Sequence, residues 1–289
     1  MKTLHVVCGP TASGKTAFAI QLAQKLPAEI ISADSRQFYK EIPIGTAAPT
    51  PQEKALVPHH LVGHLSINQS YTAAQFVHDA DQIIENLFLS YNHVVVCGGS
   101  GLYLQMLLFS SDNIPAVSPE IRNKVNRIFE QEGLDALHDF LHKHDPEFLM
   151  DEQQALNPRR CIRAMEVFLE SGKKMSELKS NNPIPRYNFE CYYPKLPREE
   201  LYIRINERTQ SMLDMGWENE CENLKDFQHV QALQTVGYKE IFSMMNGQLP
   251  RELLLEKIQQ NTRRYAKRQD TWFRNQLLSK MDSNSLHYF

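Results

Sequence analysis

The sequence has no hydrophobic run long enough to cross a membrane, and we expect no secretory leader. Its longest apolar runs, 83–89 and 102–109, fall far short of the roughly 18 residues that a membrane-spanning helix needs. At the N-terminus only five mostly apolar residues, 4–8, precede Gly9-Pro10, and no small-residue cleavage site follows them. We therefore expect a cytoplasmic protein.

Paired cysteines are also missing. The chain has five scattered cysteines and no CxxC pair, which argues against a disulfide framework and against a zinc site built from cysteines. We expect free and largely buried thiols at Cys8, Cys97, Cys161, Cys191 and Cys221.

The sequence lacks an excess of positive charge as well. Lys and Arg number 31 against 34 Asp and Glu, a net charge of -3, so any surface that binds nucleic acid must be local. The 42% hydrophobic and 22% charged fractions are ordinary for a globular protein. At roughly 150 residues per domain, the 289 residues predict about two domains.

The first third of the chain alternates buried strands with amphipathic helices. Short apolar runs at 4–8, 29–32 and 93–97 predict strands, and apolar residues at helical spacing predict helices over 15–26 and 71–89. This order predicts a parallel α/β sheet with ligand-binding loops at the carboxyl ends of the strands.

The residue pattern of the chain changes after about residue 113. Two prolines interrupt the chain near 115–119, and 120–168 looks mostly helical. The proline-rich stretch 180–197 is typical of a linker with some extended structure, and 199–227 and 251–278 show helical patterns.

Two arrangements fit this pattern: two domains in series, or a helical insertion within one α/β core. We favour the second. It gives a P-loop NTPase-like α/β core at 1–112 and 190–289 with C-terminal helices, and a mainly helical inserted domain at 113–189.

The first loop matches GxxxxGK[ST] directly after a strand and directly before a helix, a context that makes this common pattern a strong signal. Its glycines let backbone N–H groups approach phosphate oxygens, Lys15 adds a charge, and the Thr16 hydroxyl can hold Mg²⁺. The loop predicts binding of a diphosphate or of a nucleotide such as ATP, without separating them; the alternative is a turn that binds nothing. Its residues are Gly9, Pro10, Thr11, Ala12, Ser13, Gly14, Lys15 and Thr16.

Two absences make an ordinary ATPase or GTPase a poor fit. The strand at 93–97 ends in Gly98-Gly99 instead of the aspartate that holds Mg²⁺ in many P-loop NTPases. No NKxD-type segment, which would bind guanine, is present.

Polar residues follow the other two strands. Asp34, just past the second strand, can act as a base or ligate Mg²⁺, or it can simply stabilise an Asx-type turn. Ser100, in a glycine-rich loop after the third strand, offers a hydroxyl, although a tight turn would look the same. The adjacent His59 and His60 point to opposite faces of a strand, so we favour hydrogen-bonding histidines over a metal site.

In this order, the loops resemble those of the tRNA dimethylallyltransferase family, bacterial type. The matching segments are GPTASGKT at 9–16, SADSRQFY at 32–39, GTAAPT at 45–50, VPHHL at 57–61, YTAAQF at 71–76, GGSGLY at 98–103, NPRR at 157–160 with RAMEV at 163–167, TVGYKE at 235–240, and TRRY at 262–265 continuing to WFR at 272–274. They cover nearly the whole chain. The sequence departs from the family where Ser100 replaces threonine, Ala48 replaces lysine and Pro158 replaces aspartate, and it lacks the zinc finger of eukaryotic members.

The resemblance implies transfer of a dimethylallyl group from dimethylallyl diphosphate to N6 of adenine 37, just 3′ of the anticodon, in tRNAs that read codons beginning with U. It implies Asp34 as the base, Lys15 and Ser100 as groups that stabilise the departing diphosphate, and Mg²⁺ at Thr16. The base and the diphosphate are expected to enter a channel from opposite sides, and the partner is the anticodon stem-loop. A monomer is expected.

Basic residues with interleaved aromatics support an RNA partner. Residues 263–274 carry five positive charges against one acid, and a second cluster lies at 159–163. Either cluster alone fits a solvated basic face; together they favour a clamp for RNA. The candidate tRNA-binding residues are Asp34, Ser35, Arg36, Gln37, Ser100, Arg159, Arg160, Arg163, Arg263, Arg264, Lys267 and Arg268.

Three other functions stay open at this point. A small-molecule kinase would have a similar loop and lid, and an adenylate isopentenyltransferase would alkylate a free nucleotide, although the C-terminal basic region argues against both. A non-catalytic RNA-binding module would use the P-loop only to sense a nucleotide.

Overall fold

A computed structural model describes residues 1–110, 114–178 and 184–289. Two compact units divide the chain: 1–109 with 185–289, and 110–184. The predicted boundary between 112 and 113 lies outside the described residues. The chain re-enters the first unit at Pro185, which pairs with Phe109, whereas the sequence predicts re-entry at 190.

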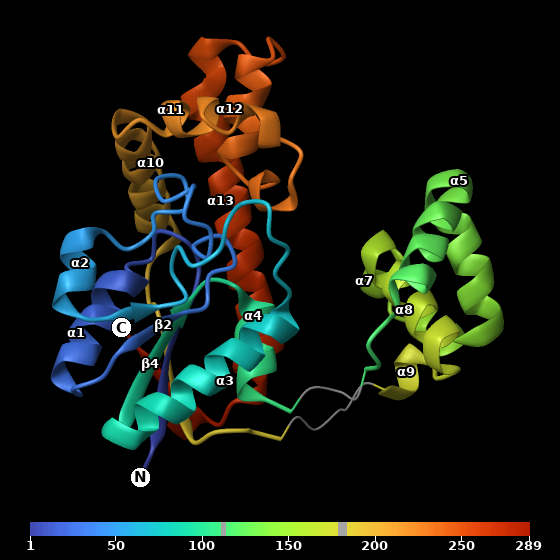
Figure 1. The fold of residues 1–289 in the computed structure, drawn as a ribbon, viewed down its shortest axis with the longest axis horizontal. Coiled ribbons are helices and arrows are strands. Elements are labelled where there is room, and N and C mark those ends of the chain that lie inside the picture. The colour runs from blue at the N-terminus through green and yellow to red at the C-terminus, as the bar shows by residue number, and fades with distance from the viewer. Residues whose placement is uncertain (111–113, 179–183) are drawn as a thin grey trace. The chain divides into compact units, whose positions relative to one another are not determined.

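The first unit is built on a six-stranded sheet in the order β3-β2-β4-β1-β5-β6 (Figure 1). Every paired strand is parallel to its neighbour. The strands are β1 (Thr3–Cys8), β2 (Ile30–Ser32), β3 (His59–His60), β4 (His93–Gly98), β5 (Phe189–Tyr193) and β6 (Leu286–Tyr288). The predicted α/β fold with a parallel sheet is confirmed.

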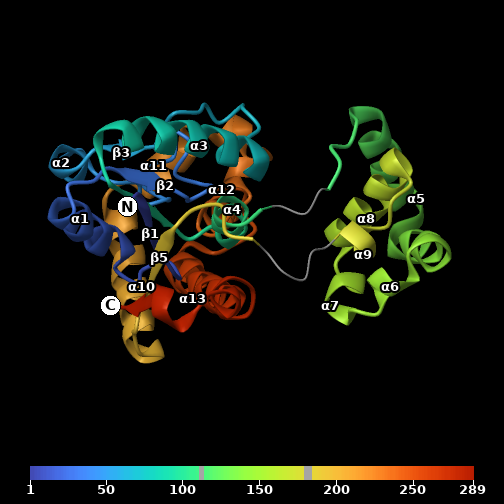
Figure 2. The ribbon, with the colours of Figure 1, turned by 90° about the horizontal axis from the view of Figure 1, so that it is seen from below.

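Helices cover both faces of the sheet because the central strands are apolar on both sides. Along β1, Leu4 and Val6 pack with α3 (Ala73–Ser90) and α4 (Gly101–Leu108). Val7, which points to the other face, packs with α1 (Lys15–Lys25). Figure 2 shows α1 and α4 on opposite sides of β1. A short helix, α2 (Pro51–Leu56), begins with a capping box at Thr50.

The C-terminal half of the first unit adds α10 (Arg198–Asp214), α11 (Trp217–Glu222), α12 (Tyr238–Met245) and α13 (Leu254–Trp272). Figure 1 shows α10 and α13 side by side, and Leu201 and Ile205 of α10 pack on Ala266 of α13. A π-helical turn, Phe273–Leu277, continues α13. These helices present side chains to the loops at the carboxyl ends of the strands.

The second unit contains only helices among its described elements, and its helical character was predicted. They are α5 (Pro119–His144), which is interrupted at Gly133 (φ 77°), and α6 (Pro146–Leu149), α7 (Glu152–Ala155), α8 (Pro158–Ser171) and α9 (Met175–Leu178). Its own core contains Val125, Leu137, Leu141 and Ala164.

All five cysteines are free, and only Cys97 is partly exposed, as predicted. Among the described helices, none is both long and apolar enough to span a bilayer.

A buried carboxylate, Glu220 of α11, organises the loop that follows β2. It is 9% exposed and accepts hydrogen bonds from Ile44 N (2.8 Å), Gly45 N (3.0 Å) and the Tyr238 hydroxyl (2.5 Å). Burial and the adjacent Glu220 charge raise the pKa of Tyr238 well above its usual value, so this hydroxyl stays a donor. Glu220 thereby fixes residues 44–45 against α11 and α12.

We expect Glu220→Ala to lower the free energy of unfolding by about 3–5 kcal/mol, because it leaves two half-buried amides and the buried Tyr238 hydroxyl without this charged acceptor. The matched control is Glu218→Ala on the same helix, whose partner Arg251 is 65% exposed; this pair should contribute at most about 1 kcal/mol. Urea unfolding measures both variants. Equal losses for the two would contradict the role given to Glu220.

Candidate active site

The phosphate loop joins β1 to the first turn of α1. Ala12 (φ 61°) and Gly14 (φ 88°) have left-handed backbone conformations, which turn successive N–H groups toward one concave side. Lys15 Nζ (2.6 Å) and the Ser13 hydroxyl (2.8 Å) both donate to Pro10 O. The buried Ser13 therefore holds the loop in shape, and Lys15 lies folded over it.

Asp34 follows β2 at the same edge of the sheet. Its Oδ1 accepts from Arg36 N (3.0 Å), so the Asx-type turn considered above is present. The same carboxylate lines a cavity with Thr11 and Thr16 of the phosphate loop. Asp34 can serve both roles, because the turn uses only one of its two oxygens.

Gln37 performs a structural task within the same loop. Its Oε1 accepts from the Ser32 hydroxyl (3.1 Å), and its Nε2 donates to Ala47 O (3.1 Å) and Thr46 O (3.3 Å). Arg36 reaches outward and donates to Gln231 O (2.9 Å). Of the two, Arg36 has more freedom to contact a ligand.

The glycine-rich loop after β4 packs on the Asp34 loop. Ser100 Oγ accepts from Ser35 N (2.9 Å), and Ser100 N donates to Ala33 O (3.2 Å). A Cβ at Gly98 would lie 2.2 Å from Ala33 O, so this close approach requires glycine. Ser100 is not among the residues that line the cavity at Asp34, and this favours positioning of the Asp34 loop over contact with a leaving group.

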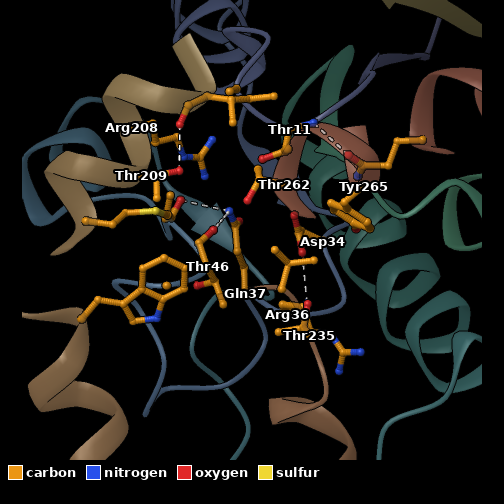
Figure 3. Close-up of a pocket in the computed structure, with 18 of the residues that line it drawn as sticks. Thr11, Asp34, Arg36, Gln37, Thr46, Arg208, Thr209, Thr235, Thr262 and Tyr265 are labelled. Atoms are coloured by element: carbon orange, nitrogen blue, oxygen red, sulfur yellow. Dashed lines mark hydrogen bonds between the residues drawn. The ribbon is translucent and has the colours of Figure 1, made fainter. Parts of the chain in front are cut away.

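A central cavity of about 110 Å³ brings these parts together (Figure 3). Figure 3 shows Arg208 of α10 and Asp34 on opposite sides of it. Arg208 makes no hydrogen bond or ion pair with the described residues, and it was not predicted. No motif marks it in the sequence; the only signal is its helical spacing from Arg204.

Half-buried charges of both signs lie at or beside this cavity. Burial lowers the pKa of Lys15; Cys97 and Asp34 oppose this shift, and Arg208 adds to it. Burial also lowers the pKa of Arg208, and Asp34 opposes the shift. Arg36 and Arg208 line the cavity with Asp34, and Lys15 lies in the adjoining one, so the site has a net positive charge that suits a ligand with several negative charges.

Two larger cavities adjoin the central one. The first, about 590 Å³, shares Thr16 and Arg208 with it and also contains Lys15 and Arg204. We call this the phosphate-side mouth. The second, about 300 Å³, shares Tyr265 and Gln269 with the central cavity.

We call the second cavity the base-side mouth; Ser35, Ser100, Arg268 and Trp272 also line it. Burial, together with the nearby Asp34, raises the pKa of Tyr265 to about 12, so its hydroxyl is protonated at neutral pH. The three cavities thus form a row, with Asp34 in the middle one.

The comparisons with known proteins agree with this geometry. A family model described as IPP transferase matches residues 37–276. The tRNA dimethylallyltransferase of Cytophaga hutchinsonii is 43% identical over 275 residues, which cover 94% of this chain and 90% of the relative. That of Christiangramia forsetii is 41% identical over 288 residues, 98% of this chain and 95% of the relative. The chain belongs to this family.

Solved structures of the family have the same fold. The tRNA isopentenylpyrophosphate transferase of Bacillus halodurans matches with a TM-score of 0.71 at 32% identity, covering 100% of this chain and 90% of that one. A eukaryotic dimethylallyltransferase described as acting on tRNA matches with a TM-score of 0.86 at 28% identity, covering 100% of this chain and 74% of that one.

The basic residues of α13 in this transferase lie on two sides of the helix. Arg268 lines the base-side mouth, 5.9 Å from the Tyr265 ring, and Arg264 is exposed one turn away. Arg263 donates to Asn206 Oδ1 on α10 (2.7 Å), and Lys267 lines a different cavity. Only Arg264 and Arg268 therefore share the side of Ser100.

In the second unit, Arg159 and Arg160 are exposed in the first turn of α8, which Asn157 caps. Arg163 donates to Pro115 O (3.1 Å) and pairs with Glu166 (3.4 Å), so its guanidinium has structural partners. Contact of these three arginines with tRNA stays a prediction.

The histidine pair of β3 is hydrogen-bonded as expected. His59 Nδ1 lies 2.8 Å from Val57 O, and His60 Nε2 lies 2.6 Å from Glu29 Oε2. Across the described residues, no three His, Cys, Asp or Glu side chains gather in a metal-binding cluster.

Gln269 of α13 is a second site residue that the sequence did not reveal. It is 8% exposed; its Oε1 accepts from Thr11 N (2.9 Å) and its Nε2 donates to Gly99 O (3.0 Å). It thus ties the phosphate loop to the loop of the base-side mouth. We infer that it positions the two loops, because it lies in the wall between their cavities.

We expect Gln269→Met to lower kcat by about 100-fold with little change in either KM, because it keeps the side-chain length but releases both loops from their relative position. Gln276→Met, on the π-helical turn with an exposed side chain, is the control. Steady-state kinetics with both substrates decide the matter. An unchanged kcat in a folded Gln269→Met enzyme would show that the bridge does not position the site.

Proposed function

We infer that this transferase moves a dimethylallyl group from dimethylallyl diphosphate to N6 of adenine 37, 3′ of the anticodon, in tRNAs that read codons beginning with U. The observation that carries the proposal is the placement of Asp34 in one cavity with the phosphate loop and Arg208. Membership of the family and the names of its relatives support the same reaction.

The acceptor side requires a base. An exocyclic adenine amine is a weak nucleophile because its lone pair is delocalised into the ring. In our proposal the Asp34 oxygen that the turn leaves unused takes the N6 proton as the N–C bond forms. The Asx turn holds the carboxylate in place for this task.

The donor side requires stabilisation of a leaving group. Cleavage of the C–O bond of the allylic diphosphate places negative charge on the departing oxygen. Lys15, Arg208 and the amides of the phosphate loop surround that position from the phosphate-side mouth. Preorganised donors of this kind stabilise the transition state more than the ground state.

The residues present fit a magnesium ion. The Thr16 hydroxyl supplies an oxygen donor at this cavity, and Mg²⁺ prefers oxygen ligands shared with substrate phosphates. A bound ion would neutralise part of the diphosphate charge. Its presence is a proposal that rests on this donor set.

The RNA must deliver the adenine from its stack, at a cost of roughly a few kcal/mol. We propose that the base enters past Ser35, Ser100 and Trp272, whose indole ring offers a stacking surface. Arg264 and Arg268, with Arg36, would hold the phosphates nearby. The exposed Arg159 and Arg160 of the second unit are proposed as further contacts.

The cellular setting is also a proposal. Five free thiols suit a reducing compartment, which supports a cytoplasmic enzyme. We further propose that it acts as a monomer. A kinase, the alternative weighed from the sequence, would have no use for the base-side mouth.

Intact-mass analysis of an unmodified tRNA tests the proposal. With Mg²⁺ and dimethylallyl diphosphate, we expect one dimethylallyl increment that disappears when adenine 37 is replaced. Asp34→Asn keeps an oxygen for the turn but has no carboxylate, so its rate should fall about 10²–10⁴-fold while tRNA binding is retained.

Two outcomes would contradict the proposal. No increment, with ATP consumed in a parallel reaction, would favour a kinase. A wild-type rate for Asp34→Asn would reduce Asp34 to a turn residue.

A further inference from the structure

The central cavity has an apolar end as well as a charged one. Met212 of α10, Trp217 of α11 and Val236 give this cavity apolar lining, and Ile205 of α10 adds to it next to Ala12 of the phosphate loop. Ile205, Met212 and Trp217 are each at most 6% exposed. A charged end beside an apolar end matches an allylic diphosphate, whose isoprenoid tail has no polar atom.

Trp217 is held rigidly at this end. A Cβ at Gly45 would lie 2.0 Å from its Nε1, and a Cβ at Gly237 would lie 1.8 Å from its ring. The indole therefore packs directly against the backbone at Gly45 and at Gly237, where no side chain would fit. The Tyr238 ring meets it edge-on at 5.5 Å.

Glu220 restrains this packing, because it accepts hydrogen bonds from both Gly45 N and the Tyr238 hydroxyl. Because Gly45 and Tyr238 contact the indole, these hydrogen bonds hold two of its neighbours in place. A longer ligand must then displace the ring or leave part of its tail outside the cavity of about 110 Å³.

We propose that Trp217 is the end wall of the isoprenoid pocket and limits the donor to five carbons. This rests on the proposed function, since it assigns the tail of that same substrate. Geranyl diphosphate, the next isoprenoid diphosphate, has five more carbons, and with Trp217 as the end wall the cavity would have no room for them. Trp217 is thus a specificity-determining residue for the length of the transferred group.

The test compares kcat/KM for geranyl diphosphate with that for dimethylallyl diphosphate, with the same tRNA. One methylene in an apolar pocket changes selectivity about 10–200-fold. We expect Trp217→Ala to raise the geranyl-to-dimethylallyl ratio at least about 100-fold, and Trp217→Leu to raise it by about 10-fold. The Leu variant keeps the test valid if the Ala variant fails to fold.

Phe242→Leu is the control, because Phe242 is buried in α12 within the same core cluster but does not line the cavity. It should leave the ratio unchanged. An unchanged ratio in both folded Trp217 variants would overturn the proposal. So would a ratio that stays constant while KM for tRNA rises, since the apolar end would then hold the adenine.

A wild-type enzyme that fails to prenylate tRNA with dimethylallyl diphosphate would instead overturn the proposed function itself.

Discussion

The hydrogen-bonded ladder through β2, β4 and β1 brings three loops to one edge of the sheet. Ser32 pairs with Cys97, and Cys8 pairs with Gly98, so the strands end at nearly the same level. The phosphate loop, the Asp34 loop and the glycine-rich loop all begin there. Because parallel strands present their carboxyl ends together, three segments far apart in the sequence form one site.

The loops do not hold this arrangement alone. Ser100 joins the second loop to the third, and Gln269 joins the first to the third. Gln269 comes from α13, so the C-terminal helix is part of the wall between the central cavity and the base-side mouth. The site therefore depends on the last part of the chain as much as on the first.

Its charge balance points to the substrate. Lys15 and Arg208 face the single carboxylate of Asp34, and burial works against both cations. Placing cations in a partly dehydrated site is unfavourable by itself. In the function proposed above, a bound diphosphate would pair with both cations and offset this cost. The charges would then favour binding at the position where the leaving group forms.

Local sequence patterns predict the central strands and the phosphate loop. The strands β1, β2 and β4 are short apolar runs, and the phosphate loop is a motif that encodes its own backbone shape. The edge strands β3 and β6 have two and three residues, too few to show a period. β5 lies in the stretch predicted to be a linker with some extended structure, where no strand was assigned. They form because a neighbouring strand offers its edge.

The site residues also divide into those that local motifs predict and those that only the structure reveals. Asp34, Lys15 and Thr16 lie within motifs and were found, whereas Arg208, Gln269 and Trp217 lie on helices whose sequence only predicts a helix. Their roles arise from contacts with residues more than 160 positions away, such as Gln269 with Thr11 and Gly99. Helical spacing along one segment carries no information about such a partner.

Steady-state kinetics of Arg208→Ala and Arg268→Ala test the central claim, that two substrates reach Asp34 from two sides. We predict that Arg208→Ala raises KM for dimethylallyl diphosphate by about 10–100-fold, because it removes a charge-assisted contact, and leaves KM for tRNA nearly unchanged. Arg268→Ala should do the reverse and flatten the salt dependence of tRNA binding. If both variants raised KM for the same substrate, the account of two mouths would be wrong.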